Sequence, residues 1–412
     1  MKTQMRILKL FLLLLLIPFF LQAQNNRFFD VKGKDIISPN GKAIVLTGTN
    51  LGNWLIPEGY MFKFKDASSP RMINQVLTEL VGPDKTADFW EKYLNNYITK
   101  ADIHYLKSSG MNSIRIPFHY KMFTTESYLG SNDPDRGFKL LDRVIKWCKE
   151  ENLPVILDMH CAPGGQTGDN IDDSDGYPFL FESEKGKTLT INIWNKIALH
   201  YKDETTVIGY DLLNEPIAHY FDIKKLNPHL EPLYKSITAA IRKVDKNHII
   251  FLGGAQWDSN FKVFNAPFDN KLVYTFHKYW TATTQDVIQE YLDFSNKYNV
   301  PIYVGETGEN KDQWILEFRL LMEKNKISWH FWPYKKMDAK SGIITFPIPE
   351  NYNLVIKYAD QPKTSFADLR KYAPTDRTLV EQALENLLEK CKFENCSTND
   401  GYLKGLGLKE GK

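Results

Sequence analysis

Eight short runs rich in β-branched and other apolar residues recur along the chain, with helical patterns between them. Segments such as 140–147 and 233–241 place apolar residues at the i, i+3 and i+4 positions of helices that cover a sheet. Eight consecutive βα units predict an α/β fold of the (β/α)8 TIM-barrel type rather than a doubly wound sheet. The runs are residues 43–47, 113–117, 154–158, 207–213, 248–252, 272–276, 301–304 and 327–331.

Composition fits one large globular domain. The chain has 412 residues, of which 43% are hydrophobic and 25% are charged. Its net charge is +2 without a concentrated Lys/Arg block, which argues against a nucleic-acid surface. Residues 48–53 lack dinucleotide-binding spacing and no Walker-type lysine motif occurs, so we expect no cofactor.

The N-terminus has the pattern of a secretory signal at residues 1–23. Lys2, Arg6 and Lys9 precede an apolar stretch of about 12 residues, shorter than the roughly 20 that span a bilayer. We therefore expect an exported, secreted, periplasmic or cell-surface protein with no membrane insertion after cleavage. A monomeric catalytic domain is predicted at 24–374, and a C-terminal helix and tail at 375–412 that pack on the barrel or trail from it.

The four cysteines leave the disulfide question open. Cys391 and Cys396 are close enough to close a small loop in an exported protein, and they are as well read as free thiols. Cys148 and Cys161 lack the spacing of zinc ligands and are expected to be buried free thiols.

Glu215 and Glu306 each end an apolar run, Glu215 in an Asn-Glu-Pro turn and Glu306 in a Gly-Glu-Thr-Gly turn. A barrel gathers such strand ends at one face, so the two carboxyl groups should meet there. An acid that protonates a leaving oxygen, with a carboxylate that meets an oxocarbenium ion, is what hydrolysis of a glycosidic bond requires. We predict the separation of about 5 to 5.5 Å that gives retention.

Polar and aromatic residues occupy the other predicted strand ends. They combine groups that hydrogen-bond to hydroxyls with indole faces that pack on pyranose rings, which is typical of a sugar site. Arg115 is expected to keep Glu306 anionic. The residues are Arg115, Asp158, His160, Asn214, His277, Tyr279, Trp280 and Trp332.

With these residues in place, the chain resembles glycoside hydrolase family 5, within the clan of TIM-barrel retaining glycosidases. The resemblance covers most of residues 27–365. It implies that Glu215 is the acid/base and Glu306 the nucleophile, with no metal in the chemistry. It also implies supporting roles for Arg115, Asn214, His277 and Tyr279, and substrate contacts for His160 and Trp332.

Two longer motifs are similar to the exo-acting β-1,3-glucanase branch of that family. They are Asn-Leu-Gly-Asn-Trp-Leu at 50–55 and the loop sequence at 160–170. They imply a β-glucan or oligosaccharide substrate, cleaved in the manner of a glucan 1,3-β-glucosidase. An endo-β-1,4-glucanase or another β-glycanase of the family remains the alternative. Further substrate contacts are expected from Asn53, Trp54, Asn170 and Trp280.

Two readings from other classes stay open. A carbohydrate-binding barrel without catalysis would keep the fold and lose the chemistry, whereas His160, His277 and Asp158 could ligate a metal in a barrel hydrolase. Residues 169–175 form an acidic cluster that either shapes the pocket as a solvated lid or holds a structural ion. Glu58, Asp258 and Glu309 also follow predicted strands and could line subsites.

Overall fold

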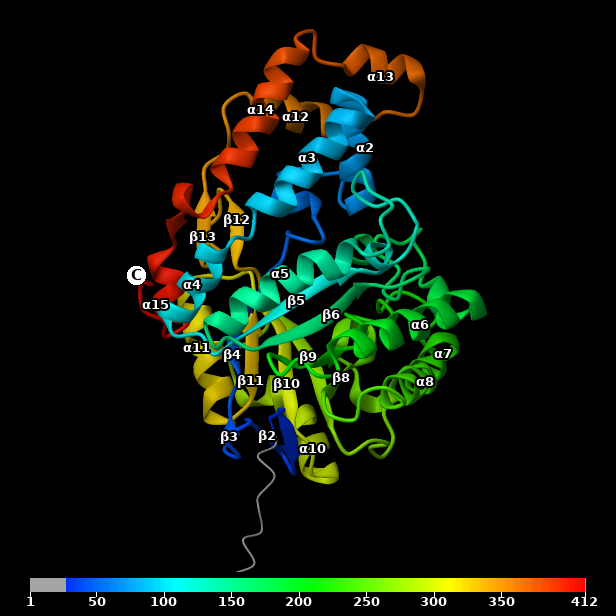
Figure 1. The fold of residues 1–412 in the computed structure, drawn as a ribbon, viewed down its shortest axis with the longest axis vertical. Coiled ribbons are helices and arrows are strands. Elements are labelled where there is room, and N and C mark those ends of the chain that lie inside the picture. The colour runs from blue at the N-terminus through cyan, green and yellow to red at the C-terminus, as the bar shows by residue number, and fades with distance from the viewer. Residues whose placement is uncertain (1–26, 412) are drawn as a thin grey trace, which may run out of the picture.

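The computed structural model describes residues 27–411, and the predicted signal peptide lies outside this range. Its centre is a closed barrel of parallel strands in the order β10-β11-β4-β5-β6-β7-β8-β9 (Figure 1). This confirms the predicted (β/α)8 fold. The strands are β4 (Thr47–Asn50), β5 (Ser113–His119), β6 (Val155–Cys161), β7 (Val207–Asp211), β8 (Ile249–Gly253), β9 (Leu272–Tyr279), β10 (Ile302–Gly308) and β11 (Ser328–Phe331).

The first barrel strand begins later than predicted. Residues 43–47 are divided between β3 (Ala43–Ile44) and the start of β4, because β3 pairs with β2 (Asp35–Ile37), which pairs with β1 (Asp30–Lys32) in an antiparallel sheet. Leu46 packs with residues at the N-terminal ends of the barrel strands, including Ile156. The small sheet therefore covers the end of the barrel opposite the strand C-termini.

Amphipathic helices surround the barrel. In α5 (Arg136–Glu150) the buried residues Leu140, Leu141, Val144 and Ile145 recur at helical spacing on one face, as the sequence pattern predicted. The other covering helices are α4 (Lys100–Ser109), α6 (Glu184–Tyr201), α8 (Leu230–Arg242), α10 (Gln289–Tyr298) and α11 (Asp312–Lys324), and short α7 (Ile223–Leu226) and α9 (Ala255–Asp258) lie in loops.

A group of helices stands away from the barrel, at the opposite end of the molecule from β2 and β3 (Figure 1). It combines α2 (Pro70–Val81) and α3 (Pro83–Asn96) with α12 (Tyr352–Ala359) and α14 (Arg377–Lys390), which contact one another. Gly82 joins α2 to α3 at φ +85°, where a side chain would be strained. The helical extension thus includes segments far from the C-terminus, beyond those expected from the sequence.

The chain ends beside the barrel. A small sheet contains β12 (Lys335–Met337), β13 (Ile344–Phe346) and β14 (Ser397–Thr398), and α15 (Asp400–Gly405) packs on α11. The remaining helix, α13 (Phe366–Tyr372), connects α12 to α14. All four cysteines are free thiols. Among residues 27–411, none of the helices has the length and apolar character to cross a bilayer.

Candidate active site

A cavity of about 780 Å³ opens at the C-terminal ends of the barrel strands. Both Glu215 and Glu306 line it, as the barrel prediction required. Their neighbours in its wall are Glu58, Tyr60, His160, Ile171, His219, Gln256, Trp257, Ser259, His277, Lys278, Tyr279, Trp280, Thr281, Glu309 and Trp332.

The two glutamates face each other across the cavity floor. Oxygen atoms of Glu215 and Glu306 and a ring nitrogen of His277 all lie within 4.8 Å of one another. Glu215 follows β7 at φ +47°, and Glu306 lies at a register irregularity in β10. These local departures from regular strand geometry coincide with the position of both carboxyl groups.

Arg115 organises the floor below Glu306. Its guanidinium donates to Glu306 Oε1 at 2.6 Å, to Asp211 Oδ2 at 2.9 Å and to Asn214 Oδ1 at 2.9 Å, and Nη2 lies 3.1 Å from Asp158 Oδ1. Every one of these partners is buried. Burial raises the pKa of Asp158 and of Asp211 to about 7, against the opposing effect of Arg115. With Asn50, whose Oδ1 accepts from Arg115 at 3.1 Å, one cation therefore holds five polar side chains around the cavity floor.

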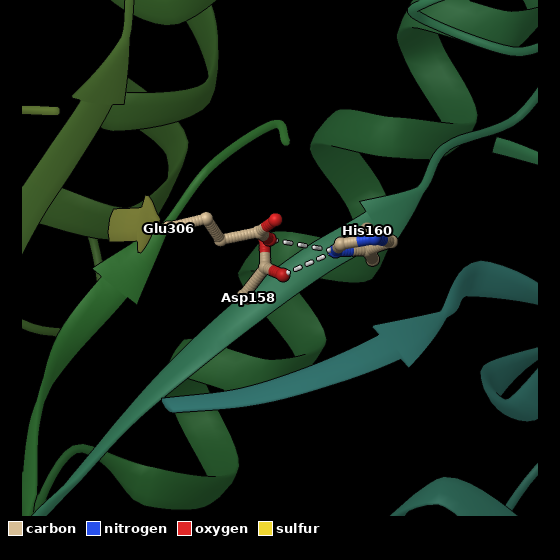
Figure 2. A group of neighbouring side chains, drawn as sticks. All are labelled: Asp158, His160 and Glu306. Atoms are coloured by element: carbon tan, nitrogen blue, oxygen red, sulfur yellow. Dashed lines mark hydrogen bonds and ion pairs between the residues drawn. The ribbon is translucent and has the colours of Figure 1, made fainter. Parts of the chain in front are cut away.

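His160 lies between the floor and one wall. Figure 2 shows its ring facing Asp158 and Glu306, and the distance from Nδ1 to Asp158 Oδ2 is 2.8 Å. The ring also stacks on Trp332, with centroids 5.5 Å apart and planes 7° apart. Burial lowers the pKa of His160 to about 4, so the ring is neutral near pH 7. Its Nε2 lies 3.3 Å from Nδ2 of Asn214, so the neutral ring links Asp158 to Asn214.

Glu215 and Glu306 have different surroundings. Burial raises the pKa of Glu215 to about 7, although His160 and Arg115 oppose the shift. Its Oε1 lies 2.8 Å from Nδ1 of His277, a ring whose pKa burial lowers to about 3. Glu306 instead accepts hydrogen bonds from Arg115 and, at 3.1 Å, from Tyr279. Glu215 can hold a proton near pH 7, and Glu306 accepts hydrogen bonds from a cation and a phenol.

Among the predicted substrate contacts, His160, Trp280 and Trp332 line the cavity. Three others lie outside its wall, and for the two that are buried, Trp54 and Asn53, this corrects the expectation. Trp54 is fully buried and donates its indole N–H to the carbonyl of Leu94. Asn53 is buried and accepts the backbone N–H of Glu58. Asn170 lies in a turn that Asp169 caps, outside the cavity wall.

The sequence assigned no role to Asp211 and gave Glu58 only as a possible subsite residue. Asp211 lies inside a predicted strand, and the sequence does not show that its side chain meets Arg115. Glu58, expected as a possible subsite residue, has its carboxyl group buried at the cavity, and its Oε1 has no hydrogen-bond partner among the described residues. Burial and the charges of Glu306, Glu309 and Glu215 raise its pKa. A polar ligand atom is a suitable partner for this oxygen.

The donor sets fit neither proposed ion. Atoms of Asp158, His160 and Glu306 converge within 4.8 Å, but Arg115 is bonded to both carboxyl groups and supplies the positive charge there. In the acidic loop, Asp172 accepts N–H groups of Thr167, Gly168 and Ser174. Asp173 accepts the backbone N–H of Arg71, and Asp175 forms an ion pair with the Arg71 side chain, so the acids of this loop have separate partners.

Comparison with known proteins agrees with this architecture. Residues 76–338 match the family model described as Cellulase (glycosyl hydrolase family 5). A β-xylosidase of Phanerodontia chrysosporium is 34% identical over 238 residues, which cover 58% of this chain and 48% of that protein. A sporulation-specific glucan 1,3-β-glucosidase of Saccharomyces cerevisiae is 31% identical over 246 residues, or 55% of this chain and 54% of that protein. The chain thus spans about half the length of these two relatives.

Solved structures share the fold. The rutinosidase from Aspergillus niger superposes with a TM-score of 0.55 at 18% identity, over 76% of this chain and 91% of that one. The family model extends from α2 to β12 and so includes seven of the eight barrel strands, β5 to β11, together with both glutamates. The chain therefore belongs to glycosyl hydrolase family 5, confirming the resemblance in its motifs, and is a glycoside hydrolase.

Proposed function

We propose that the protein is a retaining β-glycosidase in which Glu306 is the nucleophile and Glu215 the acid/base. The observation that carries this proposal is the approach of the two carboxyl groups to within 4.8 Å. A pair at about 5 to 5.5 Å leaves no room for a water between carboxylate and sugar, whereas inverting enzymes need roughly 6.5 to 9.5 Å. The short approach supports a covalent glycosyl-enzyme.

In the first step, Glu306 attacks the anomeric carbon and Glu215 gives its proton to the leaving oxygen. The raised pKa of Glu215 suits the donor, and the hydrogen bonds from Arg115 and Tyr279 orient the attacking carboxylate. In the second step, Glu215 takes a proton from water, which attacks the same carbon and releases Glu306. Asn214, buried between Arg115 and His160, supports these two side chains.

We propose a β-glucan or its oligosaccharides as substrate, cleaved from the chain end. Similarity to a glucan 1,3-β-glucosidase supports the linkage. Neutral His160, Trp332 and the unpartnered Glu58 oxygen supply the stacking surface and hydrogen-bonding groups for an uncharged sugar. Four carboxyl groups around one cavity disfavour a uronic acid at this position. We also propose that the protein is exported and acts as a monomer.

The test is hydrolysis of aryl β-glucoside and aryl β-laminaribioside by the wild type, Glu306→Ala and Glu215→Ala. We expect Glu306→Ala to lose turnover on both, and Glu215→Ala to lose most on poor leaving groups and to recover with azide. Proton NMR of the first product should show the β-anomer. An α-anomer would overturn retention, and an inert wild type would favour a sugar-binding barrel.

Product analysis on soluble glucan tests the chain-end proposal. We expect one small product from the earliest times. Mixed-length products at low conversion would instead indicate endo cleavage, the mode of an endo-β-1,4-glucanase, without affecting the roles of the two glutamates.

A further inference from the structure

Asp258 lies behind the cavity wall, on the opposite side of His277 from Glu215. It is fully buried, and its Oδ2 is 3.2 Å from His277 Nε2, while Nδ1 of the same ring is 2.8 Å from Glu215 Oε1. Nδ1 is hydrogen-bonded to Glu215, whereas Nε2 and both carboxyl oxygens of Asp258 have no hydrogen-bond partner among the described residues. An unpartnered ring nitrogen therefore faces an unpartnered buried carboxyl group. Nothing in the two-step displacement by Glu215 and Glu306 requires Asp258.

The backbone is shaped to bring Asp258 there. Gln256, Trp257 and Asp258 have φ values of +52°, +62° and +57°, a run of left-handed residues without glycine, which turns the chain after β8 back toward the barrel. Gly253 supplies the space, because a Cβ at that position would lie 2.1 Å from Asp258 Oδ1. Strain of this kind persists where the surrounding structure holds it, and it clusters at functional sites.

Because His277 is neutral, the position of its ring hydrogen is coupled to the protonation of Glu215. With a pKa of about 3, the ring carries one N–H near neutral pH. If that hydrogen is on Nε2, it faces Asp258, and Nδ1 can only accept, so Glu215 must be the donor and hold a proton. If it is on Nδ1, it donates to an ionised Glu215, and Asp258 must hold the proton.

We propose that Asp258 is a positioning residue that keeps the ring hydrogen of His277 on Nε2 and thereby favours the protonated, proton-donating form of Glu215. This inference rests on the proposed acid/base role of Glu215. Asp258 touches no substrate atom in this arrangement and acts through the imidazole.

Other charged groups face this chain of three residues. They bear on the balance between the two arrangements, but among the described residues Asp258 is the only carboxyl group within ion-pair distance of His277 Nε2. Burial, Asp211 and Glu215 raise the pKa of Asp258, while Arg115 and the backbone N–H of Glu215 lower it. The pKa of His277 is affected by Glu306, Arg115 and His160. The pKa of Glu215 is affected by His160, Arg115 and Asp169. Asp258 is also faced by Tyr234 and Tyr291.

Asp258→Asn removes the charge and keeps the shape. We expect the alkaline limb of kcat/KM to move down by about one pH unit, which lowers the rate on a phenyl β-glucoside about fivefold at pH 7. A dinitrophenyl glucoside, whose leaving group needs no proton, should change little. A residue that merely held the fold would lower both rates at every pH and leave the limb in place.

The matched control is Asp245→Asn. Asp245 is also buried and lies 2.6 Å from a buried imidazole, His248, but that pair is outside the cavity wall. We expect the alkaline limb of the kcat/KM profile to lie at the wild-type pH in this variant. A limb in Asp258→Asn that does not move, or that moves upward, would overturn the proposal, as would equal losses on the two substrates.

A second measurement needs neither turnover nor a folded variant at position 258. The ¹⁵N shifts of the wild-type His277 ring, assigned by comparison with His277→Gln, distinguish the two tautomers. Hydrogen on Nε2 near pH 6 supports the proposal, and hydrogen on Nδ1 overturns it. Retained activity in Glu215→Ala would instead refute the proposed function, so the two failures are distinguishable.

Discussion

Arg115 donates a hydrogen bond of 2.6 Å to Glu306, and both side chains are buried in the cavity floor. The guanidinium spans Glu306, Asp211 and Asn214 at once, with donors fixed in a plane. A lysine ammonium is a single point of charge and cannot reproduce that geometry.

We expect Arg115→Lys to lower kcat on an aryl β-glucoside by about 100-fold, because the nucleophile and Asn214 lose their common support. Steady-state kinetics measures the effect. Arg136→Lys is the control, since Arg136 is also buried but bonds to the carbonyls of Tyr128 and Leu129. Equal kcat losses in the two variants would indicate a general defect of the fold and contradict the prediction.

Glu58→Gln tests the unpartnered carboxyl group. We expect kcat/KM on β-glucosides to fall about tenfold, because the carboxyl oxygen that would bond a sugar hydroxyl is replaced by an amide with different donors and acceptors. Glu231→Gln is a matched control, since both glutamates are 5% exposed and Glu231 bonds Asn265 and Lys235 elsewhere. If Glu58→Gln hydrolyses β-glucosides at the wild-type rate, Glu58 has no role in sugar binding.

Glu215→Gln should change stability with pH. Glu215 has a pKa of about 7 in the folded protein and a usual value of 4.5, so both states hold the proton below 4.5. Between 4.5 and 7 the unfolded chain ionises first, which lowers the free energy of unfolding, and above 7 the loss is constant. The loss is at most about 3 kcal/mol.

Glutamine does not titrate, so the variant does not lose this stability as the pH rises. The free energy of unfolding of the variant minus that of the wild type should therefore be larger at pH 8 than at pH 5. Urea unfolding at both pH values measures the difference. A difference between the two proteins that is the same at pH 5 and pH 8 would show that burial does not raise the pKa of Glu215. A gain at pH 8 would show that the catalytic carboxyl group destabilises the folded protein.

The sequence predicted what depends on local pattern. Short β-branched and apolar runs marked the barrel strands, and Glu215 and Glu306 were found because a barrel brings every strand C-terminus to one face. Asp211 was missed, because it acts through Arg115, which is 96 residues away in the sequence. No local pattern in β7 indicates which partner its side chain meets.

Trp54 shows the opposite error. An aromatic residue in a motif after the first strand suggested a sugar contact, but its indole is buried against α3, whose Leu94 carbonyl accepts the N–H. The group of helices that covers it joins segments from both ends of the chain, such as α3 and α14. Their packing depends on long-range contacts, which helical periodicity alone does not specify.

Trp280 supports the last prediction, on the leaving group. It is 74% exposed at the cavity rim, its indole N–H donates to the carbonyl of Glu309 at 3.1 Å, and it follows the strand that carries His277 beside Glu215. An anchored ring with a free face on this side is suited to stack on a departing sugar or aryl group. Such a contact contributes about 1 kcal/mol.

We therefore expect Trp280→Ala to lower kcat/KM about fivefold on laminaribiose and aryl glucosides, and to leave glucosyl fluoride, whose leaving group is a single atom, nearly unchanged. Phe366→Ala is the control, because Phe366 is 80% exposed on α13 and lies outside the cavity wall. An equal loss on glucosyl fluoride would mean that Trp280 contacts the retained sugar, and no loss on any substrate would mean that it contacts neither. The fluoride comparison therefore assigns the ring to one side of the scissile bond.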